Sequence, residues 1–255
     1  METQICGLKT EYLISGNGDI PVVLLHGWGS SFDVYKGVIS ALNDRCKFYA
    51  VNFPACGGSE IMKEKWNLDN YCEFVTEFIS AMGIDHKDAV FIGHSHGGRV
   101  ILSLAGNGII TPKEIVLFDS AGIVAEKTKR QKRRAKNFKR IKKVLTLPVI
   151  KNFSGSLLDK ARRHYGSADY NAAPPVLRNT MVSLVNTDLR DKLSNIKCPT
   201  LLIWGENDTD TPLSSAEIIK SKISDFGLCV IKGTGHFSFC EKPYEANAIL
   251  RAFIK

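Results

Sequence analysis

Short apolar runs alternate along the chain with longer stretches in which apolar residues recur every three or four positions. The short runs are rich in Val, Ile, Leu and Phe and lack strict alternation, which predicts strands buried on both faces of a sheet. These runs lie at 21–25, 47–51, 89–92, 115–118, 201–204 and 228–231. The longer stretches predict amphipathic helices at 68–82, 214–223 and 241–254. Strands and helices in this rhythm are typical of an α/β fold with a mostly parallel sheet and helices on both faces.

The segment 122–195 breaks this rhythm, because it contains no clear buried strand. It holds 18 Lys and Arg against 5 Asp and Glu, a net charge of +13, while the rest of the chain carries −5. So sharp a change in composition predicts a helical cap (lid) at 122–195, inserted into a core formed by 1–121 and 196–255. The insertion follows one predicted strand and precedes the next, so we expect the cap to lie over the carboxyl end of the sheet.

The composition excludes several classes of protein. The longest stretches without a charged residue, 20–32 and 100–112, have thirteen residues each, and a membrane-spanning helix needs about 18. The first fifteen residues have no apolar core of signal-peptide length, so the sequence predicts a cytoplasmic protein that is not transmembrane. Seven scattered Cys with no C-x-x-C pair indicate reduced, mostly buried thiols, with no disulfide frame or zinc site.

The strongest chemical signal is the run Gly-His-Ser-His-Gly-Gly at 93–98, which fits the pattern G-x-S-x-G. A predicted strand precedes the run and a predicted helix follows it, which is the context of a nucleophile elbow. Only small residues fit on either side of so tight a turn, which accounts for Gly93 and Gly97. The turn lifts the hydroxyl of Ser95 clear of the sheet at the positive end of a helix dipole, so we predict that Ser95 is a catalytic nucleophile.

A serine hydroxyl keeps its proton at neutral pH and needs a neighbouring base. His236 follows a predicted strand in a glycine-rich turn late in the chain, and it is the best candidate for that base. The base in turn needs an acid to fix its tautomer and to stabilise the imidazolium. Asp208, just past the end of a predicted strand, is the first choice, and Asp210 and Asp119 remain open as alternatives. Ser95, Asp208 and His236 follow one of the known chain orders of a catalytic triad.

Catalysis of acyl transfer also needs an oxyanion hole built from two N–H groups. The N–H of His96, next after the nucleophile, is one candidate. The other is the N–H of Trp28 in the turn His-Gly-Trp-Gly at 26–29, where glycine lets the backbone approach a substrate closely. This machinery needs no organic cofactor, and we expect no metal, because the elbow turns His94 and His96 to different sides.

These motifs (HGWG, GHSHGG, WGEND followed by TP, and GTGH) resemble those of the α/β-hydrolase superfamily, and the resemblance covers nearly the whole chain. It implies an eight-stranded sheet with an antiparallel second strand and a cap after the sixth strand. The HGWG form is also similar to the pimeloyl-carrier-protein methyl ester esterase group. Ser95 departs from the haloalkane dehalogenases, which carry Asp there. The resemblance leaves the substrate open, because substrate choice depends on the cap.

The leading hypothesis is a serine hydrolase that cleaves small-molecule carboxylic esters through an acyl-enzyme intermediate. The same triad suits a C–C bond next to a ketone, a lactone, a thioester or an N-terminal peptide bond, although a cap with so few acidic residues argues against an amine-binding peptidase. A ligand-binding protein with little turnover on the same fold is a third hypothesis. An intact set of catalytic residues argues against it.

Eleven Lys and Arg gather at 127–143, on a predicted helix at 126–148 with one apolar stripe. The simplest interpretation is a solvated cap helix that packs its stripe over the pocket. The charge also makes an acidic carrier protein or an anionic surface a candidate partner. Nucleic acid is disfavoured, because no aromatic residues interleave with the charges.

Overall fold

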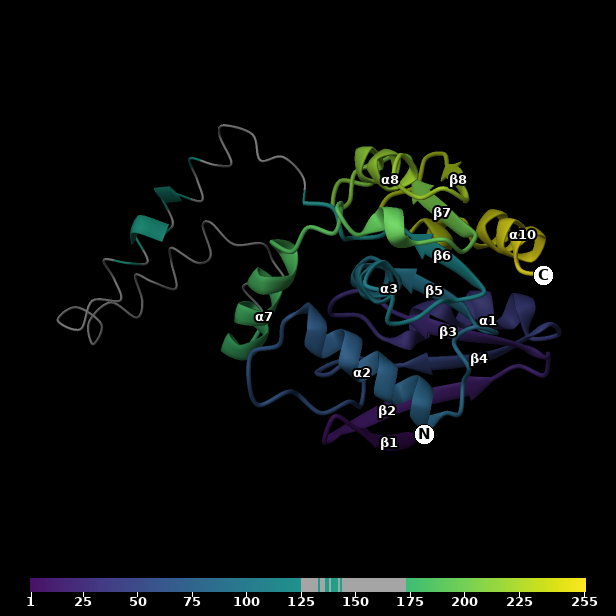
Figure 1. Ribbon diagram of the computed structural model, residues 1–255, viewed down its shortest axis with the longest axis horizontal. Coiled ribbons are helices and arrows are strands. Elements are labelled where there is room, and N and C mark those ends of the chain that lie inside the picture. The colour runs from purple at the N-terminus through teal and green to yellow at the C-terminus, as the bar shows by residue number, and fades with distance from the viewer. Residues whose placement is uncertain (125–132, 134–135, 138, 142, 144–172) are drawn as a thin grey trace.

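An eight-stranded sheet organises the chain in a computed structural model that describes residues 1–124, 133, 136–137, 139–141, 143 and 173–255. The strand order across the sheet is β1-β2-β4-β3-β5-β6-β7-β8 (Figure 1). The second strand pairs antiparallel with both of its neighbours, and every other pair is parallel. The strands are β1 (Glu2–Ile5), β2 (Leu8–Ser15), β3 (Ile20–Leu25), β4 (Cys46–Val51), β5 (Val90–His94), β6 (Glu114–Phe118), β7 (Thr200–Gly205) and β8 (Phe226–Ile231). The predicted fold class and the antiparallel second strand are confirmed.

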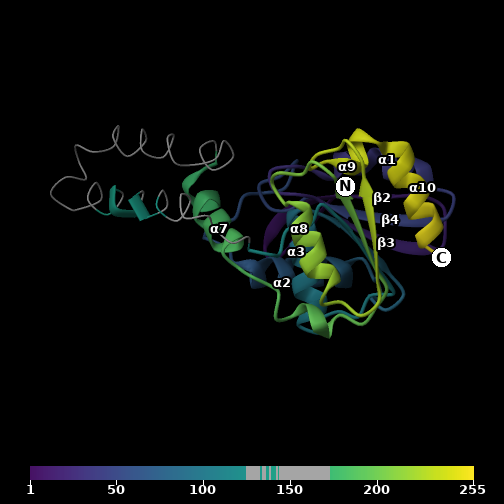
Figure 2. The ribbon, with the colours of Figure 1, turned by 90° about the horizontal axis from the view of Figure 1, so that it is seen from above.

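Helices cover both faces of this sheet, as Figure 2 shows. The described helices are α1 (Lys36–Leu42), α2 (Leu68–Ala81), α3 (His96–Gly106), α7 (Pro175–Val185), α8 (Leu213–Lys220), α9 (Ser238–Glu241) and α10 (Pro243–Phe253), with short 3-10 turns η1 (Phe32–Tyr35) and η2 (Leu193–Asn195). Helices α2, α3 and α8 bury apolar residues on one face, and α1 and α10 bury theirs on the other. The sheet therefore separates two hydrophobic cores, which is why its central strands carry apolar residues in both directions.

The strand predictions were right at the centre of the sheet and wrong at one edge. Every residue of β5 and β6 is buried, as the continuous apolar runs predicted. The run at 228–231 belongs to β8, which is the edge strand of the described sheet and pairs with β7, and the exposed fractions of Phe226 and Val230 are 40% and 37%. The interpretation of this run as a strand covered on both faces was therefore wrong. An apolar run alone does not distinguish a central strand from a hydrophobic edge strand.

The basic insertion joins the sixth strand to the seventh, since β6 ends at Phe118 and β7 begins at Thr200. Most of the predicted cap helix at 126–148 lies outside the described residues, so the cap at 122–195 stays a prediction. Helix α7 is described and lies at the carboxyl end of the sheet. Thr180 of α7 is buried, and its Oγ1 accepts a hydrogen bond from the N–H of Trp66 at 3.0 Å. This bond fixes α7 to the loop that precedes α2.

Two further expectations concern the whole chain. Among the described residues, no helix is long and apolar enough to cross a membrane. All seven cysteines are free in the structure, but only Cys46 and Cys72 are buried, and Cys240 is exposed. The expectation of mostly buried thiols was therefore wrong.

Candidate active site

Ser95 forms the tight turn between β5 and α3. Its backbone φ of 49° lies in the left-handed region, which residues other than glycine rarely adopt. The Ser95 N–H donates to the carbonyl of Phe118 at 3.0 Å, and the Ser95 carbonyl accepts from the N–H groups of Ala121 (3.0 Å) and Arg99 (3.1 Å). Strained backbone that its surroundings hold in place is typical of a functional residue.

The glycines beside Ser95 are required for space, as the sequence pattern predicted. A Cβ on Gly97 would lie 1.9 Å from the carbonyl oxygen of Leu25, and one on Gly93 would lie 2.6 Å from the nitrogen of Gly98. Neither position has room for a side chain. The first turn of α3 therefore packs directly against the end of β3, which brings Ser95 close to the turn that follows that strand.

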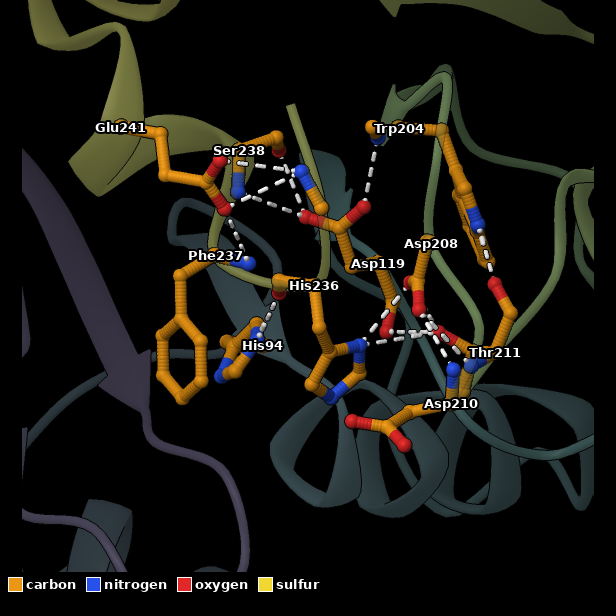
Figure 3. A network of polar contacts seen from close by, with 12 residues as sticks. His94, Asp119, Trp204, Asp208, Asp210, Thr211, His236, Phe237, Ser238 and Glu241 are labelled. Atoms are coloured by element: carbon orange, nitrogen blue, oxygen red, sulfur yellow. Dashed lines mark hydrogen bonds and ion pairs between the residues drawn. The ribbon is translucent and has the colours of Figure 1, made fainter. Parts of the chain in front are cut away.

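Asp208 and His236 meet at the carboxyl ends of β7 and β8 (Figure 3). Asp208 Oδ2 lies 2.9 Å from His236 Nδ1. The Asp208 carboxylate is wholly covered, whereas 15% of the His236 side chain is exposed. A carboxylate can only accept, so Nδ1 carries the proton of the neutral ring and Nε2 is left as the acceptor. The end of β7 and the loop after β8 can approach this closely because residue 205 is glycine. A Cβ at Gly205 would lie 2.0 Å from the carbonyl oxygen of Gly235.

The pair shifts the pKa values of both partners. Burial by itself would lower the pKa of His236, but the hydrogen bond and the charge of Asp208, with smaller contributions from Asp210 and Asp119, raise it above its ordinary value. Burial would likewise raise the pKa of Asp208, and the hydrogen bonds from His236 and Thr211 hold it below its ordinary value. The carboxylate therefore stays ionised beside an imidazole that accepts a proton readily.

Thr211 supports the Asp208 carboxylate, a role that no pattern in the sequence predicted. Its Oγ1 lies 2.6 Å from Asp208 Oδ2, 2.9 Å from the carbonyl oxygen of Asp119 and 3.2 Å from His236 Nδ1 (Figure 3). Asp208 Oδ1 also accepts from the N–H groups of Thr211 (3.0 Å) and Asp210 (2.8 Å). Both oxygens of Asp208 are thus occupied by donors, which fixes the plane of the carboxylate.

Asp119, one of the two alternatives for the acid, makes no hydrogen bond to His236 in the described part of the chain. Its carboxylate accepts from the Gly205 N–H at 2.7 Å and from the Ser238 N–H at 3.2 Å and hydroxyl at 2.5 Å. Burial raises the pKa of Asp119 to about 7, against the effect of these hydrogen bonds. The residue ties the end of β6 to β7 and to the helix that follows His236.

Asp210, the other alternative, does not bond to His236 Nδ1 either. It lines the same cavity as His236, and its charge contributes to the raised pKa of the imidazole. The structure therefore brings Asp208, and neither alternative, into hydrogen-bond contact with the candidate base.

His94 positions the backbone of the candidate base. Its Nε2 lies 2.8 Å from the carbonyl oxygen of His236, and the two ring centroids are 4.9 Å apart. Burial, together with the charge of His236, lowers the pKa of His94 to about 3. The ring therefore stays neutral and donates from Nε2. Among the described residues, no group of His, Cys, Asp or Glu is arranged to hold a metal ion.

A cavity of about 530 Å³ connects these elements. Ser95 and His236 both line it, and helix α7 contributes Met181 and Leu184 to its wall. Within the described residues, Ser95 Oγ has no hydrogen-bond partner. Such bonds are often long or unformed before a substrate binds, so the shared cavity is the more informative observation.

The two candidate oxyanion donors line the same cavity. His96 is the first residue of α3, so its N–H has no intrahelical partner. In the described chain, the N–H of Trp28 donates to no backbone oxygen either. The ring of His96 packs edge-on against Trp28 and Tyr71, with centroids 5.8 and 4.6 Å apart. The two residues that carry the candidate donors thus line the cavity that holds Ser95.

The sequence alone did not predict the contacts of four residues in this site. Thr211 belongs to the TP pair that follows WGEND, but only the fold brings its hydroxyl to the carboxylate. His94 and Asp119 act through contacts with residues more than 80 positions away. Arg99 follows Ser95 by one helical turn, and its position in the cavity depends on the packing of α3.

Comparisons with known proteins agree with this architecture. A family model described as "Alpha/beta hydrolase family" matches residues 22–248. A pimeloyl-[acyl-carrier protein] methyl ester esterase of Wigglesworthia glossinidia brevipalpis is 26% identical over 95% of this chain and 96% of its own. A 2-hydroxy-6-oxo-6-(2'-aminophenyl)hexa-2,4-dienoic acid hydrolase of Metapseudomonas resinovorans is also 26% identical, over 96% of this chain and 87% of its own. The solved structure of an enol-lactonase from Burkholderia xenovorans LB400 superposes with a TM-score of 0.75, at 18% identity and with 99% of each chain covered.

Proposed function

The chain belongs to the alpha/beta hydrolase family, and from this premise we propose that it is a serine hydrolase that cleaves carboxylic esters through an acyl-enzyme intermediate. Its relatives in the comparisons are esterases and other hydrolases, which supports hydrolysis as the class of reaction. The observation that carries the proposal is the Asp208–His236 pair at 2.9 Å, with His236 and Ser95 on one cavity.

Each residue of the proposed site has a distinct role in the first half of the reaction. His236 Nε2 takes the proton of Ser95 as Oγ attacks the ester carbonyl. The N–H groups of Trp28 and His96 stabilise the oxyanion that forms, and the charge of Asp208 stabilises the imidazolium. His236 then protonates the leaving alcohol, and the acyl group remains on Ser95.

Water completes the reaction in the second half. His236 removes a proton from a water molecule, which attacks the acyl carbonyl of the intermediate. The same oxyanion donors act again, and the acid leaves as Ser95 regains its proton. No metal or organic cofactor takes part in these steps.

A serine substitution tests this proposal. Ser95→Ala removes the nucleophile, so we expect kcat on p-nitrophenyl butyrate to fall by about 10³-fold or more and labelling by a fluorophosphonate probe to disappear. The matched control is Ser80→Ala, because Ser80 is an exposed serine at the end of α2. Undiminished turnover or labelling in folded Ser95→Ala would refute the assignment.

Other bonds suit the same machinery, and one relative favours a specific alternative. The Metapseudomonas protein is named as a hydrolase of a 6-oxo dienoic acid, whose named groups include a ketone and no ester. A C–C bond next to a ketone is therefore the second candidate. Lactones, thioesters and N-terminal peptide bonds remain further alternatives, and a low-turnover ligand-binding protein is the third hypothesis. A substrate panel that varies the acyl length and the leaving group separates the first two, and absence of fluorophosphonate labelling would favour the third.

The basic segment 122–195 suggests a partner. Its net charge of +13 would attract an acidic carrier protein or an anionic surface, and the Wigglesworthia relative is named for a substrate linked to an acyl-carrier protein. We therefore propose docking of a carrier-linked substrate at this segment, in a cytoplasmic setting that fits the free thiols. Docking predicts that added salt slows hydrolysis of a carrier-linked ester and leaves a small neutral ester unaffected.

A further inference from the structure

Among the described residues, Arg99 lines the cavity of Ser95 without the counter-charge that a buried guanidinium normally has. It lines the cavity together with Ser95 and His236. Its Nε is buried and has no hydrogen-bond partner, and none of the ion pairs in the described part of the chain includes it. A buried charge without a partner is costly, so such a group is a candidate for binding a ligand of opposite charge.

The position of Arg99 is fixed relative to the nucleophile. Its N–H donates to the carbonyl oxygen of Ser95 at 3.1 Å, so it lies one helical turn after Ser95 at the start of α3. Residues four apart lie on the same face of a helix, with their Cβ atoms about 5–6 Å apart. Arg99 therefore lines the cavity one helical turn from the nucleophile.

The electrostatics at Arg99 favour an anion. Burial lowers the pKa of Arg99 to about 10, which still leaves the side chain positively charged at neutral pH. The histidine beside it does not add a charge, because burial and the charge of Arg99 hold the pKa of His96 well below its ordinary value. Among the described residues that line this end of the cavity, the positive charge therefore comes from the guanidinium of Arg99.

Other described residues of the cavity wall leave that charge available. Asp210 is the one acidic side chain among them, and it belongs to the loop after β7, beside Thr211 and His236. It forms no ion pair with Arg99. The wall near α7 is apolar, with Met181 and Leu184. Such a cavity suits a substrate with a short apolar stretch and one anionic end.

We propose that Arg99 binds a carboxylate of the substrate, so that the favoured substrates are hydrolysable acids with a free carboxylate a short distance from the scissile bond. The planar guanidinium can donate two parallel hydrogen bonds to a carboxylate. Such a pair selects a negatively charged substrate and also fixes its position in the cavity. This inference rests on the proposed function, and it narrows the substrate class of the same site.

The test compares esters that differ only in charge. One arm pairs monomethyl esters of C4 to C7 dicarboxylic acids with methyl esters of the same length that end in a primary amide. A second arm places the carboxylate on the leaving group, by pairing O-acetyl ω-hydroxy acids with their amides. We expect wild-type kcat/KM to favour the carboxylate in one arm by about 10- to 100-fold, and the responding arm identifies the side of the scissile bond.

Variants at Arg99 show whether this residue causes the preference for the carboxylate over the amide. Arg99→Met keeps the apolar stem without the charge and should bring the ratio of kcat/KM close to 1. Arg99→Lys keeps the charge without the fork and should give an intermediate ratio. The matched control is Arg251→Met, because Arg251 is an exposed arginine of α10 that pairs with Asp44 away from the cavity. It should leave the ratio at the wild-type value.

Two outcomes would overturn the inference. One is a wild-type ratio near 1 at every length in both arms, which decides the question even if the variants fail to fold. The other is a wild-type ratio retained in folded Arg99→Met. The proposed function fails separately, because its failure abolishes Ser95 labelling and turnover of p-nitrophenyl butyrate, whereas failure of the carboxylate inference leaves both intact.

Discussion

Asp208 and Asp119 lie just beyond the ends of neighbouring strands, β7 and β6, and both accept several hydrogen bonds in buried surroundings. Their pKa values nevertheless move in opposite directions. Burial acts to raise both, yet the pKa of Asp208 falls below its ordinary value and that of Asp119 rises to about 7. The donors to Asp208 include an imidazole that can become a cation, whereas those to Asp119 are neutral backbone and hydroxyl groups.

The comparison shows what hydrogen bonds alone achieve at this site. Neutral donors orient the Asp119 carboxylate and join three segments of chain, but they do not offset the cost of burying its charge. At Asp208 the imidazole of His236 makes the difference, since each ionised form stabilises the other. We therefore propose that Asp208 orients and stabilises the imidazolium of His236, whereas Asp119 positions the segments around it.

The largest expected effect separates these two aspartates in kinetics. Asp208→Asn leaves the wrong tautomer of His236 favoured and no charge beside the imidazolium, so we expect kcat/KM on p-nitrophenyl butyrate to fall by about 10³- to 10⁴-fold. Asp119→Asn should cost less than about tenfold, because in the described part of the chain Asp119 makes no hydrogen bond to His236. Equal losses in the two folded variants would make the comparison wrong.

Much of the architecture was predictable from hydrophobic pattern. The central strands carry unbroken apolar runs because helices cover both faces, and the runs at 89–92 and 115–118 coincide with β5 and β6. The β1–β2 hairpin was missed, because Leu8–Ser15 alternates exposed and buried positions and forms no such run. The edge strand β8 was misjudged, since its exposure follows from its place at the edge of the described sheet, which an apolar run does not reveal.

The candidate site was predictable only in part. Ser95 and His236 stand in short motifs whose glycines are dictated by local space, so the sequence singles them out. The choice of Asp208 over Asp119 depended on which carboxylate reaches Nδ1, and that follows from how the loops after β6, β7 and β8 meet. Contacts of this kind join distant segments and leave no local signature. The catalytic roles themselves stay predictions.

The second expected effect concerns stability. The pKa of Asp119 rises from 3.8 to about 7 on folding, so its contribution is fully present below 3.8 and is lost as pH rises through about 7. Asp119→Asn cannot ionise and should escape this loss. Between pH 5 and 8, wild type should therefore lose on the order of 2–3 kcal/mol of unfolding free energy relative to the variant.

Urea unfolding of wild type and Asp119→Asn at both pH values measures this effect. Asp88→Asn is the matched control, since Asp88 is an exposed aspartate before β5, and its difference from wild type should not depend on pH in this way. A difference for Asp119→Asn that is constant from pH 5 to 8 would contradict the raised pKa.

A smaller effect is expected at Thr211. Thr211→Val removes the hydroxyl that donates to Asp208 Oδ2 but keeps the shape of the side chain and the backbone N–H bond. The loss of one such hydrogen bond should lower kcat/KM by about 5- to 10-fold, and Thr211→Ser should restore most of it. Thr76→Val, on α2, removes a hydroxyl that bonds only to the carbonyl of Cys72 and serves as the control. A kcat/KM for Thr211→Val equal to wild type would assign the hydroxyl to Asp119 alone.

The smallest expected effect is the pH at which activity begins. His236 must be neutral to accept the Ser95 proton, and Asp208 raises its pKa above the ordinary 6.5, so kcat/KM should rise with pH through a midpoint above 6.5. Asp208→Asn removes the charge that raises the pKa of His236, and burial of the ring then lowers that pKa. The midpoint of the residual activity should therefore move to lower pH. Rate profiles from pH 5 to 9 with a neutral ester measure both midpoints. If the two profiles share one midpoint, the titrating group is not His236 paired with Asp208. The opposite pKa shifts of Asp208 and Asp119 would then have no effect on the measured rates.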